Sequence, residues 1–234
     1  MVNHMDMIDL ILSRRAVRSF NSRELDEQTI EKILEAARYA PSPQNSQPWH
    51  FTLIRNKASL EYLASAAKHA VFLSKAPLLI IVTVNRDVAL DDWLIQHNQH
   101  VYSGAAAMQN MWLAAWSLDI GCCWVTLDET TTRKLVAIPE EQVLIGALAI
   151  GYLDDNLPKP HEEGDRKPLS SMTSFEQFGK SEQCDTESCF TCLKLVPKSA
   201  ARSFEGEEYI KYFCGQDCYT EWQKQTKKWL NDKK

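Results

Sequence analysis

The sequence has 234 residues, of which 44% are hydrophobic and 24% are charged, and its formal net charge is −5. This length allows one sizeable hydrophobic core with a small appendage. The mildly acidic balance gives no reason to expect nucleic acid or an anionic membrane as the main partner. No apolar run approaches the roughly 20 residues that span a bilayer. Since the N-terminus lacks a basic region before an apolar core, we expect no signal peptide and a cytoplasmic protein.

Strands and helices are predicted to alternate as far as residue 153. Helical spacing of apolar side chains predicts helices over residues 7–15, 26–39, 58–70 and 130–136, and one long helix or two short ones over residues 91–119. Short apolar runs predict strands over residues 49–54, 77–84, 122–126 and 143–152. This alternation indicates a layered α/β or α+β domain.

Specific residues are expected to set the limits of these elements. Asp26 can cap the second helix, and Pro41 and Pro43 stop it. Gly121 is expected to end the long helix. The second half of that helix, residues 105–116, is apolar on nearly every side, which is typical of a helix enclosed in a core or in a subunit interface.

The composition changes after Gly179, where cysteine, glutamate, lysine and serine become frequent. We therefore predict a main domain over residues 1–180 and a small cysteine-rich domain over residues 181–234. Seven cysteines in a chain without an expected signal peptide, five of them in its last fifth, indicate metal binding rather than a disulfide framework.

The cysteine-rich domain contains two close cysteine pairs. Cys189 and Cys192 form a C-x2-C pair, and Cys214 and Cys218 form a C-x3-C pair that leads into a predicted helix. Four thiolates in this arrangement suit tetrahedral Zn²⁺, and the segment resembles treble-clef-type zinc domains. Cys184 leaves an alternative open, because its spacing to the first pair also resembles that of a plant-type [2Fe–2S] site.

Three further segments carry a family resemblance. They are Ser13-Arg14-Arg15-Ala16-Val17-Arg18-Ser19-Phe20, then the run from Ala40 to Phe51 that contains Asn45-Ser46-Gln47-Pro48-Trp49, and finally Arg166-Lys167-Pro168-Leu169. In this order they resemble the nitroreductase family over roughly residues 7–178. Ala16 departs from the pattern, because members often carry a serine there whose hydroxyl can reach the cofactor.

The resemblance implies an α+β fold with a mixed sheet flanked by helices, an intertwined homodimer, and flavin mononucleotide (FMN) as cofactor. Arginine forks suit the FMN phosphate, although arginines after a helix are also common on solvated surfaces. No side chain is predicted to be a catalytic acid, base or nucleophile, since the flavin itself carries the redox chemistry. The predicted cofactor contacts are Arg14, Arg15, Arg18, Pro41, Ser42, Pro43, Asn45, Gly121, Cys122, Arg166 and Lys167.

The implied activity is the transfer of two electrons from NAD(P)H, or from a reduced ferredoxin, to a nitroaromatic, a quinone or a similar electron-poor acceptor. Two other readings remain open. The chain can be a flavin- and zinc-containing redox sensor or protein-interaction module without ordinary turnover. It can also use the same fold for another flavin reaction, such as dehalogenation or flavin fragmentation, or for a reduction assisted by an Fe–S cluster.

Overall fold

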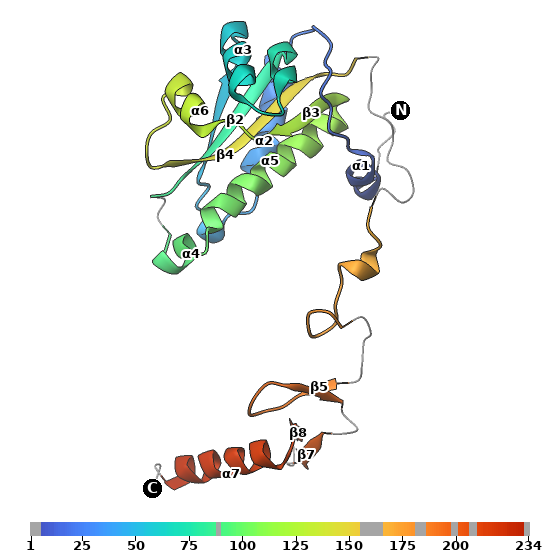
Figure 1. Ribbon diagram of the computed structural model, residues 1–234, viewed down its shortest axis with the longest axis vertical. Coiled ribbons are helices and arrows are strands. Elements are labelled where there is room, and N and C mark those ends of the chain that lie inside the picture. The colour runs from blue at the N-terminus through green and yellow to red at the C-terminus, as the bar shows by residue number, and fades with distance from the viewer. Residues whose placement is uncertain are drawn as a thin grey trace. The chain divides into compact units, whose positions relative to one another are not determined.

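A computed structural model of the chain describes residues 6–87, 90–154, 166–180, 186–197, 201–205 and 210–231. It contains two compact units, residues 1–161 and residues 162–234 (Figure 1). Residues 166–180 therefore group with the second unit by compactness, and the domain boundary after residue 180 stays a prediction. Among the described helices, none combines the length and the apolar composition needed to cross a membrane.

The first unit is built on a four-stranded sheet with the order β1-β2-β4-β3. Its strands are β1 (Trp49–Ile54), β2 (Leu78–Asn85), β3 (Ile120–Val125) and β4 (Gln142–Tyr152). The α+β class is confirmed. All pairings among these strands are antiparallel, so the expected mixed sheet is not what the described strands form. Buried apolar runs look the same in parallel and antiparallel sheets, and the sequence pattern therefore left the strand directions open.

Helices cover both faces of this sheet (Figure 1). On one face, α2 (Glu27–Arg38) and α5 (Gln99–Ser117) pack against Leu78, Ile80 and Val82 of β2. On the other face, α3 (Lys57–Ala66) and the 3₁₀ turn η2 (Val71–Lys75) pack against Leu79 and Ile81. Successive residues of β2 thus serve two separate cores, because side chains alternate across a strand. The short helix α6 (Glu129–Val136) lies on the same side as α3.

The predicted helix over residues 91–119 is two helices. α4 (Asp92–Gln96) and α5 are separated by Asn98, whose φ of 55° breaks the helical path. The prediction that Gly121 ends α5 is wrong, because α5 ends at Ser117 and Gly121 lies inside β3. Asp119, with a φ of 57°, makes the turn, which is a conformation that a short polar side chain tolerates.

The two N-terminal helices differ in how well their ends and faces are satisfied by the rest of the chain. In α2, the Asp26 carboxylate accepts a hydrogen bond from the Thr29 N–H at 2.8 Å, which confirms the predicted cap. In α1 (Met7–Ser13) only Leu10 is buried, whereas Ile8 and Leu12 are 58% and 67% exposed. Within the part of the chain that the structure describes, an apolar face of α1 is therefore left uncovered.

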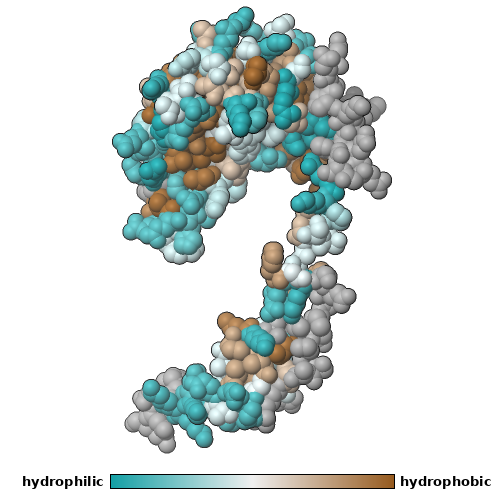
Figure 2. Space-filling model, in the orientation of Figure 1, coloured by the Kyte–Doolittle hydropathy of each residue, from teal (hydrophilic) through white to brown (hydrophobic). Residues whose placement is uncertain are grey.

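The second unit is small and rich in turns. After the 3₁₀ turn η3 (Leu169–Ser171), β5 (Thr186–Ser188) pairs with β6 (Leu195–Pro197), β7 (Arg202–Glu205) pairs with β8 (Ile210–Phe213), and α7 (Gln216–Asn231) follows. Phe213 is fully buried among the rings of Phe190, Tyr219 and Trp222. Figure 2 shows apolar side chains gathered over the hairpins of this unit, while α7 presents a mostly hydrophilic surface.

Candidate functional site

Residues 13–18, which we call the arginine segment, are held between α5 and β3. The indole N–H groups of Trp112 and Trp116 donate to the Arg15 carbonyl at 3.3 Å and to the Ser13 hydroxyl at 3.0 Å. On the other side, the Val17 N–H donates to the Cys122 carbonyl at 3.0 Å. These contacts fix a segment that has no regular secondary structure of its own, and they fix it beside the edge strand β3.

Gly121 makes this close approach possible. A Cβ atom built on Gly121 would lie 2.7 Å from the Cγ1 atom of Val17, which is far inside van der Waals contact. The space that the missing side chain leaves is therefore filled by the arginine segment. Gly121 thus supports the predicted cofactor site by positioning its neighbours, and a direct contact between Gly121 and the cofactor stays a prediction.

The arginines of this segment take three different positions. The Arg14 guanidinium lies over the Trp112 ring at 4.2 Å and is half-buried. Arg15 donates to the carbonyls of Leu12 and Arg14, both at 3.1 Å, and so caps the end of α1. Arg18 is exposed and lies next to Cys123. Arg14 and Arg18 both lie near enough to Cys123 to influence its thiol, but Arg14 packs on α5, whereas Arg15 takes up the helix-end position that arginines often occupy.

The two adjacent cysteines of β3 point to opposite faces of the sheet. Cys122 is a predicted cofactor contact, but its side chain is fully buried in the core beneath α5. It therefore points away from the Arg18 side of the sheet. Cys123 instead lines a cavity beside Arg18. Burial raises the pKa of both thiols, and the guanidiniums of Arg14 and Arg18 offset only part of the rise at Cys123. Both side chains are therefore protonated near neutral pH and are poor nucleophiles.

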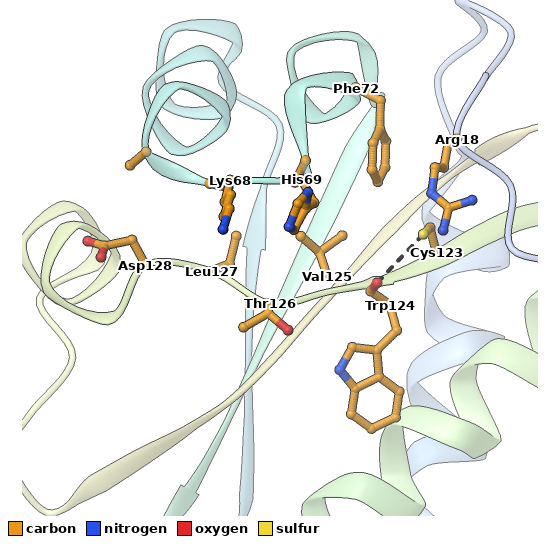
Figure 3. A pocket seen from close by; sticks show the side chains of 13 residues that line it. Arg18, Lys68, His69, Phe72, Cys123, Trp124, Val125, Thr126, Leu127 and Asp128 are labelled. Atoms are coloured by element: carbon orange, nitrogen blue, oxygen red, sulfur yellow. Dashed lines mark hydrogen bonds between the residues drawn. The ribbon is translucent and has the colours of Figure 1, made fainter.

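We call the cavity beside Arg18 the Arg18 pocket; its volume is about 420 Å³. It is lined by Arg18, residues 66–70, Phe72 and residues 123–128. Figure 3 shows Lys68 and His69, from the connection between α3 and η2, and Phe72, from η2 itself, pointing toward the chain that follows β3. Arg18 and Cys123 lie at one end of the pocket and Asp128 at the other. This size and this mixture of apolar and cationic side chains suit an aromatic ligand that carries negative charge.

The wall of this pocket depends on a bulge in the neighbouring strand. The pairing of β2 with β4 shifts between Val82 and Thr83, and Gly146 of β4 has a φ of 148°. A Cβ atom there would come within 3.0 Å of the Trp124 Nε1 atom. Glycine at this position therefore allows β3 to lie against β4 with the Trp124 ring turned to the face that carries α5 (Figure 3).

The predicted contacts of the loop after α2 lie elsewhere. Pro41, Ser42 and Pro43 line a second cavity of about 390 Å³ together with residues of α5 near Tyr102 and Ala106. We call it the Pro41 pocket; it shares no residue with the Arg18 pocket. Tyr102 is fourteen residues from Trp116, which contacts the arginine segment, and this corresponds to about 21 Å along α5. One chain therefore carries the two groups of predicted contacts at separate places.

This loop is less extended than the prolines suggested. Pro43–Asn45 forms the 3₁₀ turn η1, and Gln44, Asn45 and Gln47 all have positive φ values. The Ser42 hydroxyl accepts a hydrogen bond from the Gln47 N–H at 3.1 Å and so closes the turn. Prolines alone favour an extended backbone, whereas asparagine and a serine-closed turn favour the compact path found here. Asn45 is exposed.

The last two predicted cofactor contacts, Arg166 and Lys167, belong to the second unit. Both side chains are exposed. Their convergence with the arginines of the first unit stays a prediction. Lys68, His69 and Phe72 were not among the predicted cofactor contacts. Lys68 and His69 fall inside the helix predicted over residues 58–70, but α3 ends at Ala66, and Phe72 belongs to η2. Strand alternation indicates that Cys122 and Cys123 face opposite sides of the sheet, but it does not indicate which of them faces the cavity.

The second unit brings its four paired cysteines together. The ligand atoms of Cys189, Cys192, Cys214 and Cys218 all lie within 4.8 Å of one another. Cys189 and Cys192 occupy the turn between β5 and β6, where Leu193 has a φ of 61° and its N–H donates to the Cys189 carbonyl at 2.9 Å. Cys214 and Cys218 lie at the start of α7. Two turns that are distant in sequence thus form one candidate metal centre.

The surroundings of these sulfurs favour a bound cation. Burial opposes ionisation of Cys189, but N–H groups of Cys192, Cys214 and Thr191 point at its sulfur and lower its pKa to about 6. Hydrogen bonds to Cys214 and Cys192 raise the pKa of Cys218 to about 12, and the negative charge of Cys189 adds to this rise. The separation is 3.6 Å between the sulfurs of Cys192 and Cys214 and 3.5 Å between those of Cys214 and Cys218.

These separations match one tetrahedral ion. Four thiolates at about 2.3 Å from Zn²⁺ would lie about 3.8 Å from one another. A two-iron cluster would hold its two sulfur pairs farther apart, because each pair binds a different iron. The four cysteines therefore fit Zn²⁺ better than [2Fe–2S]. Cys184, on which the cluster alternative depended, lies outside the described residues.

Two family models match different parts of the chain. The model of the nitroreductase family matches residues 11–96 and 68–152, and that of a domain of unknown function, DUF3330, matches residues 179–233. A protein of Methanothermobacter thermautotrophicus assigned as an NADH dehydrogenase/NAD(P)H nitroreductase is 32% identical over 66% of this chain and 81% of its own length. One of Archaeoglobus fulgidus with the same assignment is 33% identical over 64% of this chain and 87% of its own.

Among solved structures, an FMN-dependent nitroreductase of Clostridium difficile R20291 has a similar fold. The TM-score is 0.63 at 24% sequence identity, and the match covers 74% of this chain and all of the other (100%). At this sequence identity the similarity concerns the fold alone.

Proposed function

The chain belongs to the nitroreductase family, and from that premise we propose that it is an FMN-dependent oxidoreductase. In this proposal it transfers two electrons from NAD(P)H to a nitroaromatic, a quinone or a similar electron-poor acceptor. The observation that carries the proposal is the Arg18 pocket, where a fixed arginine segment borders an apolar cavity at the edge of the sheet. When bound there, FMN would supply the hydride chemistry, which the protein's own side chains cannot.

The arginine segment would hold the polar parts of the cofactor. Arg14 lies over Trp112, which leaves its guanidinium positioned by an aromatic face before any phosphate binds. Arg15 can offer a second fork if it leaves the carbonyls at the end of α1. Arg18 would place its positive charge near the pyrimidine edge, where it would stabilise the negative charge of the reduced flavin.

The rest of the pocket would position and shield the reactants. Phe72, Val125 and Leu127 present an apolar wall of the kind that a flat ring system prefers. The pocket's two ends differ, because Arg18 lies at one end and Asp128 at the other (Figure 3). Within the described part of the pocket the one thiol, Cys123, is kept protonated by burial, so this thiol does not compete with the flavin as a nucleophile.

We propose that the complete site needs two copies of the chain. The Pro41 pocket and the Arg18 pocket share no residue, although the family resemblance assigns both to one flavin. A homodimer in which one copy supplies Pro41, Ser42 and Pro43 to the other copy's Arg18 pocket would unite them. The uncovered apolar face of α1 supports such an interface.

The cysteine-rich unit is proposed to hold one structural Zn²⁺ through Cys189, Cys192, Cys214 and Cys218. Its four ligands leave no open position for substrate, which is the arrangement of structural rather than catalytic zinc. A cytoplasmic location and ferredoxin as an alternative donor stay predictions.

The direct test is anaerobic titration of the FMN-loaded protein with NADH and with NADPH, followed by addition of nitrobenzene or benzoquinone. We expect the flavin absorbance to bleach with a nicotinamide and to recover stoichiometrically with the acceptor. Bleaching by reduced ferredoxin or dithionite alone would move the donor away from nicotinamide. Failure to retain FMN after reconstitution would contradict the proposal.

A further inference from the structure

Lys68, which carries a positive charge, and its sequence neighbour His69, whose imidazole can donate a hydrogen bond, both line the Arg18 pocket. We propose that this pair binds an anionic group on the reactant that stacks beside the flavin, so that the enzyme prefers carboxylated or phosphorylated reactants over neutral ones. This inference rests on the proposed function and adds the charge of the substrate to it. The anion can come from a carboxylate on the acceptor or from a phosphate of the nicotinamide donor.

The backbone that carries the pair is well anchored. Ala67, Ala70 and Leu73 are buried in the core on this face of the sheet, with exposures of 6%, 2% and 0%. The Leu73 N–H donates to the Ala70 carbonyl at 3.0 Å, and the Ala67 N–H donates to the Leu63 carbonyl at 3.1 Å. Since the residues on both sides are fixed, the exposed side chains of Lys68 and His69 must project from this turn. Figure 3 shows both pointing into the pocket.

The Lys68 ammonium and the His69 imidazole are available for a ligand. Among the described residues, no carboxylate lies within ion-pair distance of Lys68 or His69. The pocket's one carboxylate, Asp128, is engaged in capping α6, where it accepts from the Thr131 N–H at 2.8 Å. The chain as a whole is acidic, with a net charge of −5, so a cationic pocket is a local feature of this site.

The position of the pair indicates what kind of molecule it would bind. Arg18 lies at the end of the pocket that the proposed flavin contacts occupy, and Lys68 and His69 lie along the pocket from it (Figure 3). Phe72, from η2, offers an aromatic ring between the Lys68–His69 pair and Arg18. A flat ring that carries an anionic substituent would satisfy both features, because the ring contacts Phe72 and the anion receives charge-assisted hydrogen bonds.

The test compares charged and neutral probes of the same shape. Benzoate and benzamide are titrated into the oxidised FMN-loaded protein, and binding is followed by the change in the flavin spectrum. We expect benzoate to bind the wild-type protein more tightly, and its affinity to fall about tenfold in Lys68→Gln/His69→Gln, as loss of charge-assisted hydrogen bonds predicts. Benzamide binding should not change. Lys75→Gln, which removes an exposed charge from the same segment outside the pocket, is the matched control.

A kinetic arm identifies the source of the anion. A rise in KM for 4-nitrobenzoate but not for 4-nitrobenzamide in the double variant would assign the pair to the acceptor. A rise for NADPH but not for NADH would assign it to the donor's phosphate. Equal benzoate affinity in the wild-type and double-variant proteins, with both KM values unchanged, would overturn the inference.

The single variant Lys68→Gln provides a second measurement if the double variant loses FMN. A wild-type protein that retains FMN and is reduced by nicotinamide, but shows no preference for anions, overturns only this inference. A wild-type protein that binds no FMN overturns the proposed function as well.

Discussion

The two units of this protein are stabilised in different ways. In the first, two aliphatic cores on opposite faces of a sheet bury strand and helix residues completely. In the second, the buried apolar side chains among the described residues are those of Cys189 and Phe213. Burial of aliphatic surface can support a fold alone, whereas so small a core requires a metal or another cross-link. We therefore propose that the metal centre is part of the second unit's fold, whereas the proposed flavin site lies on a fold that its own two cores can support.

Removal of the metal should produce the largest difference in stability between the two units. We expect Cys214→Ser, or treatment with a strong chelator, to unfold the second unit, because zinc binding supplies on the order of 10–16 kcal/mol in small zinc domains. The first unit should keep its secondary structure and its FMN. Heteronuclear NMR together with zinc analysis would show this. Loss of the resonances of both units would contradict the separation.

A cavity in the aliphatic core should have the opposite effect. Ile33 of α2 is fully buried, and Ile33→Ala should reduce the free energy of unfolding of the first unit by about 2–5 kcal/mol. The zinc content should remain unchanged. Thermal or urea unfolding monitored by circular dichroism measures the shift. A change below about 0.5 kcal/mol would mean that Ile33 does not lie in a tightly packed core.

The arginine segment should be sensitive to the glycine beneath it. Gly121→Ala places a methyl group 2.7 Å from Val17, so the segment must move. We expect a loss of about 1–3 kcal/mol in stability, as is typical of overpacking, with a weaker affinity for FMN. FMN affinity is measured by quenching of flavin fluorescence. Gly215, around which a Cβ would meet nothing within 4 Å, offers the control substitution Gly215→Ala.

The smallest effect is expected from neutralising one exposed arginine. Arg18→Gln should weaken FMN binding by about tenfold and lower the reduction potential of the flavin, because a positive charge near the reduced form is lost. Arg23→Gln is the matched control, since Arg23 stacks on Tyr152 at 4.2 Å outside the pocket. Spectroelectrochemical titration distinguishes the two variants. An equal shift in both would show that only overall charge matters.

The same contrast explains what the sequence could predict. The cysteine centre was predictable residue by residue, because both pairs sit in local turns whose spacing alone suits a tetrahedral ion. The elements of the first unit were also predictable to within a few residues, as β1 and the capped start of α2 show. Both depend on short-range patterns.

The flavin site could be predicted only in part, because it depends on tertiary register. A shift of one residue in the register of β3 decides whether Cys122 or Cys123 faces the pocket. The residue at which β3 begins could not be read from the sequence. Gly121 looked like a helix terminator, but it is a contact point for Val17, which is distant in sequence. Lys68 and His69 were predicted to belong to a helix over residues 58–70, but α3 ends at Ala66 and both residues follow it.

We propose above that one flavin site is assembled from two chains. Size-exclusion chromatography of the FMN-loaded protein, with light scattering and flavin absorbance recorded on the same peak, tests it most directly. The account predicts a species of twice the 26.8 kDa chain mass that carries about one FMN per chain, and loss of FMN when the dimer is dissociated. Tight FMN binding by a monomer would contradict it.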